Sequence, residues 1–255
     1  MNVRELYAFL DKKIPRELSC EWDNDGLMCC PEPDREVKRV LVCLDVSDEA
    51  VNTAIEGGFD VILSHHPMIF KGIKSMVGET GPVGRVIRLI KSGISVMSFH
   101  TRFDAVDGGV NDTLAAIFDL TDVEKIECEG IELGRVGYLK QEISLAEFAA
   151  LVKEKLSAPF VSFGECSGRV QKVALVGGGG GDFVREAARS GADTFLSGNI
   201  GYHTMEEARD AGINLVEAGH YYTENPSCLS LASLVLEADC TIDIKIVQSN
   251  TISDI

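Results

Sequence analysis

Histidines close to acidic residues carry the clearest chemical signal in this 255-residue sequence. Four of its histidines stand where a predicted strand ends, and each has another histidine or a carboxylate nearby in the chain. A single histidine in such a position is more often structural, but four favour metal ligation. Imidazole and carboxylate together suit Zn, Mn, Fe, Co or Ni better than Ca or Mg alone. The histidines of the chain are His65, His66, His100, His203 and His220.

The spacing His220-x-x-x-Glu224 is the most informative one. It follows an apolar run, and Asn225-Pro226 directly after it is typical of a helix start, because proline lacks an N–H that would be unpaired there. We therefore expect Glu224 just before a helix N-terminus, where the helix dipole favours negative charge. His100-x-x-x-Asp104 has the same spacing. Taken alone, Asp104 is equally well explained as a loop or capping residue.

The adjacent pair His65-His66 bears on the number of metal ions. Neighbouring side chains on a strand point to opposite faces, and Pro67 holds His66 in an extended conformation. One ion bound by both is therefore awkward, whereas two ions about 3.5–4 Å apart, each bound by one of the pair, fit better. The ligand inventory leaves open positions for water, as in a reactive site. Such a centre would stabilise a hydroxide and attract an anionic substrate.

The composition narrows the class of protein. The net charge of −16 and the pI near 4.7 argue against nucleic-acid binding by the whole surface, which needs clustered Lys and Arg. Eight scattered cysteines without a C-x-x-C pair indicate reduced thiols, with neither zinc-finger spacing nor a disulfide framework. The N-terminus is an amphipathic helix with Asn2 and Glu5 as a capping box, not a signal peptide. No apolar run is long enough to span a membrane, so we expect a cytoplasmic protein.

Alternating strands and helices predict an α/β fold with a largely parallel sheet. The apolar runs predict strands at 39–45, 59–63, 94–98, 133–139, 172–176, 193–197, 213–217 and 241–247. Cap residues and apolar periodicity predict helices at the N-terminus and at 47–56, 83–93, 109–118, 145–156, 182–190, 203–211 and 226–237.

An internal repeat organises these elements. GGFDVILSHHP (57–67) matches SGADTFLSGNI (190–200), and SGISVMSFHTRFD (92–104) matches AGINLVEAGHYYTE (211–224). We read two similar α/β domains from a duplication, residues 1–124 and 125–255, with the metal site in the cleft between them. In an alternative interpretation, the last strand returns to the first domain. His65-His66 has no counterpart in the second copy, which carries Gly198-Asn199.

Two weaker signals concern phosphate. Gly177–Gly181 lies between a strand and a helix, where backbone N–H groups can cradle a phosphate. The dinucleotide fingerprint fails at Asp182, and a tight turn with Asp182 as N-cap is the better interpretation. Lys71, Lys74 and Arg102 flank the expected ligands and are candidates for meeting a phosphate.

Six motifs together resemble the Nif-three-like dinuclear metal centre family, whose members are often called GTP cyclohydrolase I type 2 homologues. They span nearly the whole chain, and the three histidine motifs occur in order. The motifs are WDNDGL (22–27), LDVS (44–47), ILSHHPMIFK (62–71), HTRFDAVDGGVND (100–112), GRVG (134–137) and GHYYTE (219–224). The chain departs from the family at Arg102-Phe103, usually Asn-Leu, and at Tyr202-His203, often a His pair.

The resemblance implies a ligand set, a cofactor and an assembly. His65 and His220 would hold one metal ion, His66 and Asp104 the other, Glu224 would bridge them, and His100 would lie outside the ligands. The cofactor would be two divalent ions per subunit (Zn, Fe, Mn, Co or Ni). The subunits would form a hexameric ring of two-domain α/β chains.

These observations lead to one main hypothesis and two alternatives. The main one is a metal-dependent hydrolase that uses a metal-bound hydroxide on an anionic substrate, a nucleotide or phosphoester, as a GTP cyclohydrolase-like enzyme would. The first alternative is a non-catalytic metal-binding or regulatory ring. The second, a nucleic-acid-binding ring, is disfavoured by the net charge unless its lumen is locally basic.

Overall fold

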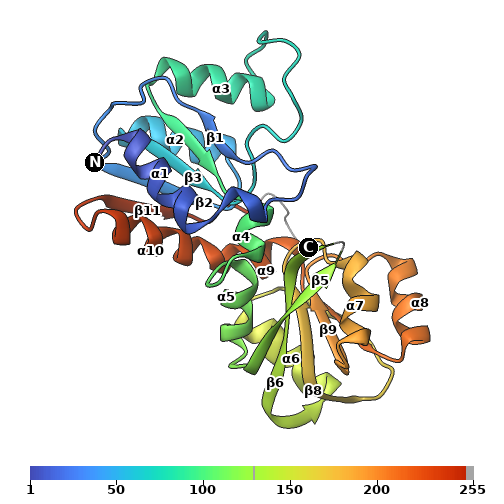
Figure 1. Cartoon of the computed structure of the whole chain (residues 1–255). Coiled ribbons are helices and arrows are strands. Elements are labelled where there is room, and N and C mark those ends of the chain that lie inside the picture. The colour runs from blue at the N-terminus through green and yellow to red at the C-terminus, as the bar shows by residue number, and fades with distance from the viewer. Residues whose placement is uncertain (129, 251–255) are drawn as a thin grey trace. The chain divides into compact units, whose positions relative to one another are not determined.

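A computed structural model describes residues 1–128 and 130–250 of the chain, which form two compact units (Figure 1). Of the described residues, the first unit contains 1–106 and 228–250, and the second contains those between 107 and 227. Each unit is a sheet with helices on both faces. This is the α/β fold with two similar halves that the sequence predicts.

The sheet of the first unit has four parallel strands and one antiparallel edge strand. The apolar residues of its three central strands are buried on both faces, as expected of a sheet covered on both sides. In sheet order the strands are β1 (Gly26–Cys29), β4 (Ser95–Ser98), β3 (Val61–Ser64), β2 (Arg39–Cys43) and β11 (Asp243–Val247). The last strand of the described chain thus pairs with β2, in the first unit's sheet.

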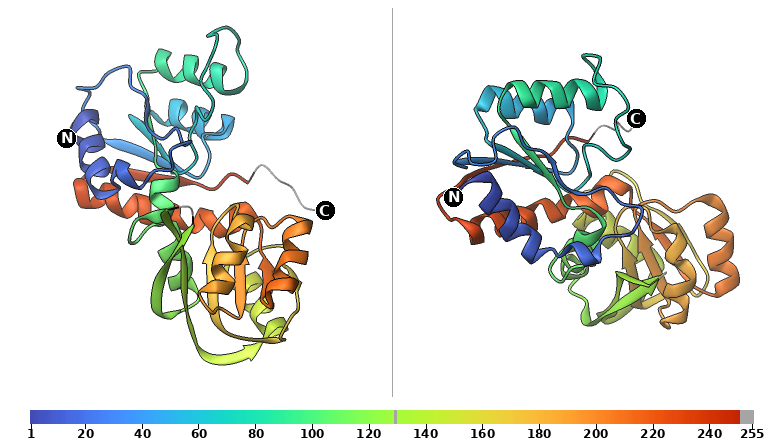
Figure 2. Two further views of the ribbon diagram at one scale, coloured as in Figure 1. Left: turned by 45° about the vertical axis from the view of Figure 1, so that its right-hand side comes forward. Right: turned by 45° about the horizontal axis from the view of Figure 1, so that its top comes forward.

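Two pairs of helices cover the two faces of this sheet (Figures 1 and 2). One pair is α1 (Val3–Lys13) with α10 (Cys228–Ala238), and the other is α2 (Asp48–Gly57) with α3 (Gly81–Lys91). The short helices of the unit are η1 (Arg16–Leu18) and α4 (Thr101–Ala105). The predicted capping box at the start of α1 is present, because Asn2 accepts from the Glu5 N–H and Glu5 from the Asn2 N–H.

The sheet of the second unit repeats this arrangement. Its three parallel strands carry an antiparallel edge strand on one side and two antiparallel strands on the other. In sheet order they are β5 (Thr121–Cys128), β6 (Ile131–Ser144), β8 (Arg169–Val176), β9 (Thr194–Ser197), β10 (Asn214–Glu217) and β7 (Ser162–Gly164). In both units a short antiparallel strand therefore pairs with the same edge of the parallel strands: β1 with β4 in the first, and β7 with β10 in the second.

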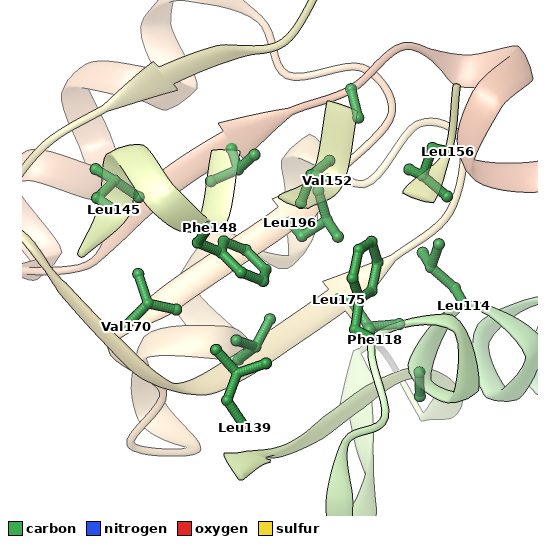
Figure 3. Packing of buried hydrophobic residues seen from close by; sticks show 14 of the residues in the cluster. Leu114, Phe118, Leu139, Leu145, Phe148, Val152, Leu156, Val170, Leu175 and Leu196 are labelled. Atoms are coloured by element: carbon green, nitrogen blue, oxygen red, sulfur yellow. The ribbon is translucent and has the colours of Figure 1, made fainter. Parts of the chain in front are cut away.

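Helices again form two layers around the second sheet. On one face, the rings of Phe118 and Phe148 pack together with centroids 5.8 Å apart over Val170 and Leu175 (Figure 3). This face carries α5 (Val110–Ile117) and α6 (Leu145–Lys155), and the other carries α7 (Val184–Arg189) and α8 (Tyr202–Ala211). The remaining segments are η2 (Gly181–Phe183), α9 (His220–Glu224) and η3 (Asn225–Ser227). Because α5 belongs to this core, the units divide after Val106 and not at residue 124.

The acidic residue of the sequence repeat has the same structural role in both units. Asp60 Oδ2 accepts hydrogen bonds from the N–H groups of Lys38 and Arg39 at the start of β2, at 2.8 and 3.0 Å. Asp193 Oδ2 accepts hydrogen bonds from the N–H groups of Gln171 and Lys172 within β8, at 2.9 and 2.8 Å. Each carboxylate therefore ties the neighbouring strand to the strand that begins directly after the aspartate.

Several predicted elements differ from the structure. The edge strands β1, β5 and β7 are absent from the predicted strands, because an edge strand needs no continuous apolar run. The one-turn helix α4 was also missed, and β6 extends well beyond the predicted 133–139. Asp182 lies inside η2, and the side chain at the start of α7 makes no capping bond, so the predicted Asp182 N-cap is wrong. Among the described helices, none is long and apolar enough to cross a membrane.

Candidate metal centre

The ligand candidates of the first unit gather where its parallel strands end, the usual place for ligands in an α/β sheet. Asp45 follows β2, His65-His66 follows β3, and Asp104 lies on α4 after β4. His65 Nε2 and Asp104 Oδ1 are 3.6 Å apart. The rings of His65 and His66 have centroids 5.0 Å apart at 40°.

The expectation that His65 and His66 point to opposite faces is therefore wrong. β3 ends at Ser64, and beyond it the backbone no longer follows the two-residue alternation of a strand. The side chain of Ser64 helps to set this turn, because its hydroxyl donates to the carbonyl of His66 at 2.8 Å. Together with His100, the two imidazoles form a group with nitrogen atoms close enough for one ion.

Each imidazole in this group has its Nδ1 engaged by an oxygen atom. His65 Nδ1 donates to the carbonyl of Phe99 at 2.9 Å, and His66 Nδ1 donates to Asp45 Oδ1 at 2.8 Å. Because these oxygens can only accept, the N–H must be on Nδ1, and in the neutral ring the lone pair is on Nε2. Metal-ligating histidines are held in this way in proteins, which fixes both tautomer and ring orientation.

The second unit supplies the pair His220 and Glu224. They are four residues apart on α9, so their side chains share one face, and His220 Nε2 lies 2.9 Å from Glu224 Oε2. His220 Nδ1 donates to Asn199 Oδ1 at 2.9 Å. The third imidazole thus also has an acceptor oxygen at Nδ1, and its Nε2 lies beside a carboxylate, as that of His65 does.

Glu224 is not placed before a helix N-terminus as the sequence suggested. It is the last residue of α9, and Pro226 lies within the following 3₁₀ turn, so the helix-dipole argument for Glu224 does not hold. What fixes Glu224 is the backbone packed against it. A Cβ at Gly178, whose φ is +64°, would collide with Glu224 Oε1 and come within 3.1 Å of His220 Nε2.

The glycine-rich loop after β8 makes room for this pair and is not a phosphate cradle. Its amide groups are used by side chains of the unit: Gly177 N–H donates to Asn111 Oδ1 at 2.8 Å and Gly180 N–H to Ser197 Oγ at 2.9 Å. The N–H of Gly178 donates to Thr223 Oγ1 at 3.0 Å. The tight-turn interpretation of the sequence therefore holds, although without the cap by Asp182.

His100 is held by Asp23, a residue to which sequence reasoning gave no role. His100 Nδ1 donates to Asp23 Oδ1 at 2.9 Å, and Thr101 donates to Asp23 Oδ2 through its N–H and its hydroxyl. Burial raises the pKa of Asp23, but the hydrogen bonds from His100 and Thr101 outweigh it and lower the pKa to about 2. Asp23 is therefore ionised at neutral pH and holds a proton on His100 Nδ1.

Arg102 is not a phosphate ligand. Its guanidinium is fully buried, donates to Asp11 Oδ1 at 2.7 Å and Asp25 Oδ2 at 3.1 Å, and lies over the Phe99 ring. Burial lowers its pKa, but the bond to Asp11 and the charge of Asp25 raise the pKa overall. Lys71 and Lys74, the other two candidates, are exposed on the chain between β3 and α3.

Sequence reasoning named the five ligand candidates but missed the residues that orient them. Asp45 and Asp23 stand in the quoted motifs LDVS and WDNDGL without a role, and Asn199 stands in the repeat where the first copy has His66. An acidic residue directly after a buried strand was the available signal. His203 is outside both groups; its side chain is exposed, 3.8 Å from Glu206.

Comparisons with known proteins find relatives along nearly the whole chain. A family model described as Duf34/NIF3 (NGG1p interacting factor 3) matches residues 1–255. A Streptomyces coelicolor protein named GTP cyclohydrolase 1 type 2 homolog is 34% identical, over 99% of this chain and 93% of its own. A Clostridium perfringens protein of the same name is 30% identical over 93% of this chain and 92% of its own. The crystal structure of Staphylococcus aureus hypothetical protein SA1388 superposes with a TM-score of 0.89 at 28% identity, covering 100% and 99% of the two chains.

Proposed function

The chain belongs to the Duf34/NIF3 family, and from this membership and the site geometry we propose that it is a metal-dependent hydrolase of a small anionic substrate. The substrate class is a nucleotide or a phosphoester. We propose two divalent ions per subunit, with the ligands His65, His66, Asp104, His220 and Glu224. Relatives named GTP cyclohydrolase 1 type 2 homolog support the nucleotide within this class.

One observation carries the metal proposal: three imidazoles are each held at Nδ1 by an oxygen that can only accept. Those oxygens belong to Phe99, Asp45 and Asn199, at 2.8–2.9 Å. His100 is held in the same way by Asp23, and it lies in one candidate ion-binding group with His65 and His66. In addition, a carboxylate lies beside Nε2 of His65 and of His220. This donor set of imidazole nitrogen and carboxylate oxygen suits first-row divalent ions.

The residues of the chain have distinct roles in the proposed reaction. A pair of divalent ions, when bound, supplies a water of lowered pKa as nucleophile and stabilises the developing negative charge. Asp45 and Asn199 hold the imidazoles in their binding tautomer and raise the basicity of Nε2. The buried Asp104 and Glu224 add negative charge where the cations bind. A hexameric ring, which the family resemblance implies, is the assembly we propose.

The test is metal content per subunit by elemental analysis of the full-length protein. We expect about two equivalents in the wild type and a sharp loss in Glu224→Ala and His65→Ala. His203→Ala is the matched control, because this exposed histidine is outside both ligand groups. Circular dichroism of each variant checks folding. Metal content that is low in the wild type, or unchanged in both ligand variants, would contradict the proposal.

Turnover separates the hydrolase from a non-catalytic metal protein. The metal-loaded wild type is incubated with GTP and with simple phosphoesters, and release of formate or phosphate is measured. We expect hydrolysis that Glu224→Ala abolishes. Full metal occupancy without turnover of any of these compounds would favour the non-catalytic alternative.

A further inference from the structure

Two large aromatic side chains of the first unit are exposed beside His100. Trp22, the only tryptophan of the chain, is 64% exposed, and Phe70 is 47% exposed. Their ring centroids are 6.2 Å apart at 71°. Each also meets the His100 ring edge to face, Trp22 at 6.3 Å and 74° and Phe70 at 6.2 Å and 87°. Three rings from three segments thus form one aromatic cluster.

Polar contacts of the neighbouring residues fix these exposed rings in place. Asp23, next to Trp22, binds His100 and Thr101. Asn24 donates from its side-chain amide to the carbonyl of Ile69, the residue before Phe70. The segments that carry Trp22 and Phe70 are therefore tied to each other and to His100. Rings that are exposed yet fixed in place resemble a preorganised binding surface more than a surface that packing failed to cover.

The chemistry of the surroundings selects the ligand. An exposed aromatic face binds planar heterocycles by stacking, largely regardless of which base is offered. Phe70 is followed by Lys71 and Lys74, with no acidic residue until Glu79, in a chain of net charge −16. A planar base and an anionic group on one molecule describe a nucleotide.

We propose that Trp22 and Phe70 form the face on which the base of a nucleotide stacks, next to the histidine group at the ends of β3 and β4. The inference deepens the proposed function, on which it rests: within its substrate class it selects nucleotides over simple phosphoesters. Trp22 and Phe70 act in binding and not in the chemical step. Lys71 and Lys74 supply positive charge for the phosphate.

The test is binding by metal-depleted protein, so that it does not depend on the metal centre. Calorimetric titrations use AMP and GMP, with ribose 5-phosphate as a probe that lacks the base. We expect AMP and GMP to bind at least about tenfold more tightly than ribose 5-phosphate, and Trp22→Leu and Phe70→Leu to remove most of that difference, as expected for loss of a stacking contact. Trp22→Phe should retain much of it. In the wild type, Trp22 fluorescence should change on binding.

Phe160→Leu is the matched control, because Phe160 is 56% exposed in the second unit and should not affect nucleotide binding. Equal affinity for ribose 5-phosphate and the nucleotides, or unchanged binding in both Trp22→Leu and Phe70→Leu, would overturn the inference. Loss of oligomer mass in Trp22→Leu without any change in nucleotide affinity would overturn it too, because a second copy would then be the occupant. Metal content, measured on the same variants, should remain at the wild-type value. A wild type that itself contains little metal would refute the metal centre and not the stacking face.

Discussion

Hydrogen-bond partners at Nδ1 distinguish the four histidines of the candidate ion-binding groups, His100 among them, from the exposed His203. His65, His66 and His220 each meet an oxygen that can only accept, whereas His203 has a carboxylate 3.8 Å away on an exposed helix. These partners are a carbonyl, a carboxylate and an amide, so no single residue type marks them in a sequence. What they share is a position at the end of a parallel strand.

Gly178 gives the sharpest prediction at this scale. We expect Gly178→Ala to displace the Glu224 carboxylate, because the new Cβ would collide with it, and to strain the backbone at φ +64°. Metal affinity, measured by competition with a chromogenic chelator, should fall by at least about tenfold, as for loss of a group that orients a ligand. Gly179→Ala is the control, since no atom lies within 4 Å of a Cβ there. Equal affinities in the two variants would rule out close packing of Gly178 against the site.

The sequence alone names the ligand candidates, which stay predictions, but it does not give their orientation. Residue type and strand-end position identify His65 and Glu224, because both follow from local pattern. The direction of a side chain depends on tertiary contacts, so the side-by-side rings of His65 and His66 were not predictable from strand alternation. The phosphate role suggested for Arg102 failed for the same reason. The local sequence shows a cation, and only the fold shows that Asp11 and Asp25 surround it.

At the scale of elements, local sequence signals predict helices better than strands. Ser144 and Glu147 form the predicted capping box of α6, and Ser47 caps α2 through the N–H of Ala50. Such caps use residues three apart in the chain, so they can be read from the sequence. The edge strands β1, β5 and β7 depend on partners far away in the sequence, and they were missed.

The contact between the segment before β1 and the start of α4 predicts a pH effect. The pKa of Asp23 in the folded protein is lowered to about 2. A carboxyl with a lowered folded pKa stabilises the protein above its unfolded pKa, and this contribution is lost as the pH falls through the folded pKa. Protonation therefore costs the wild type about 2 kcal/mol of unfolding free energy as the pH falls from about 4 to about 2.

Urea denaturation at a series of acidic pH values checks this effect. Asp23→Asn should be less stable than the wild type at neutral pH and should lose less stability on acidification. Asp34→Asn, an exposed carboxylate 3.4 Å from Arg4, should follow the wild-type slope. A slope of Asp23→Asn parallel to the wild type would show that Asp23 does not couple folding to pH.

At the scale of the whole molecule, the two similar units share hydrogen bonds between carboxylate side chains and backbone N–H groups, as well as a similar arrangement of strands. Asp60 and Asp193 each accept hydrogen bonds from two successive backbone N–H groups at the neighbouring parallel strand. The ligand residues have diverged between the copies, since Gly198-Asn199 replaces a histidine pair. A Cβ at Gly198 would come within 2.6 Å of Thr223 Oγ1, so the second copy has no room for a histidine there. The two copies have therefore kept the acidic residues that assemble the sheet and differ at the candidate ligand positions.

The shared role of Asp60 and Asp193 predicts matching losses of stability. Asp60→Ala and Asp193→Ala each leave two backbone N–H groups without their acceptor, which costs about 1–3 kcal/mol of unfolding free energy. Asp60→Ala should cost more, because it also removes the charge partner of Arg35, 2.9 Å away, whereas Asp193→Ala removes only an acceptor of the Thr194 hydroxyl. The two residues share no hydrogen-bond partner, so the double variant should show the sum of the single losses. Chemical denaturation of the four proteins, with Asp34→Ala as the exposed control, measures these values. A neutral effect at either position would mean that the repeated acidic residue is not a structural element of the duplicated sheet.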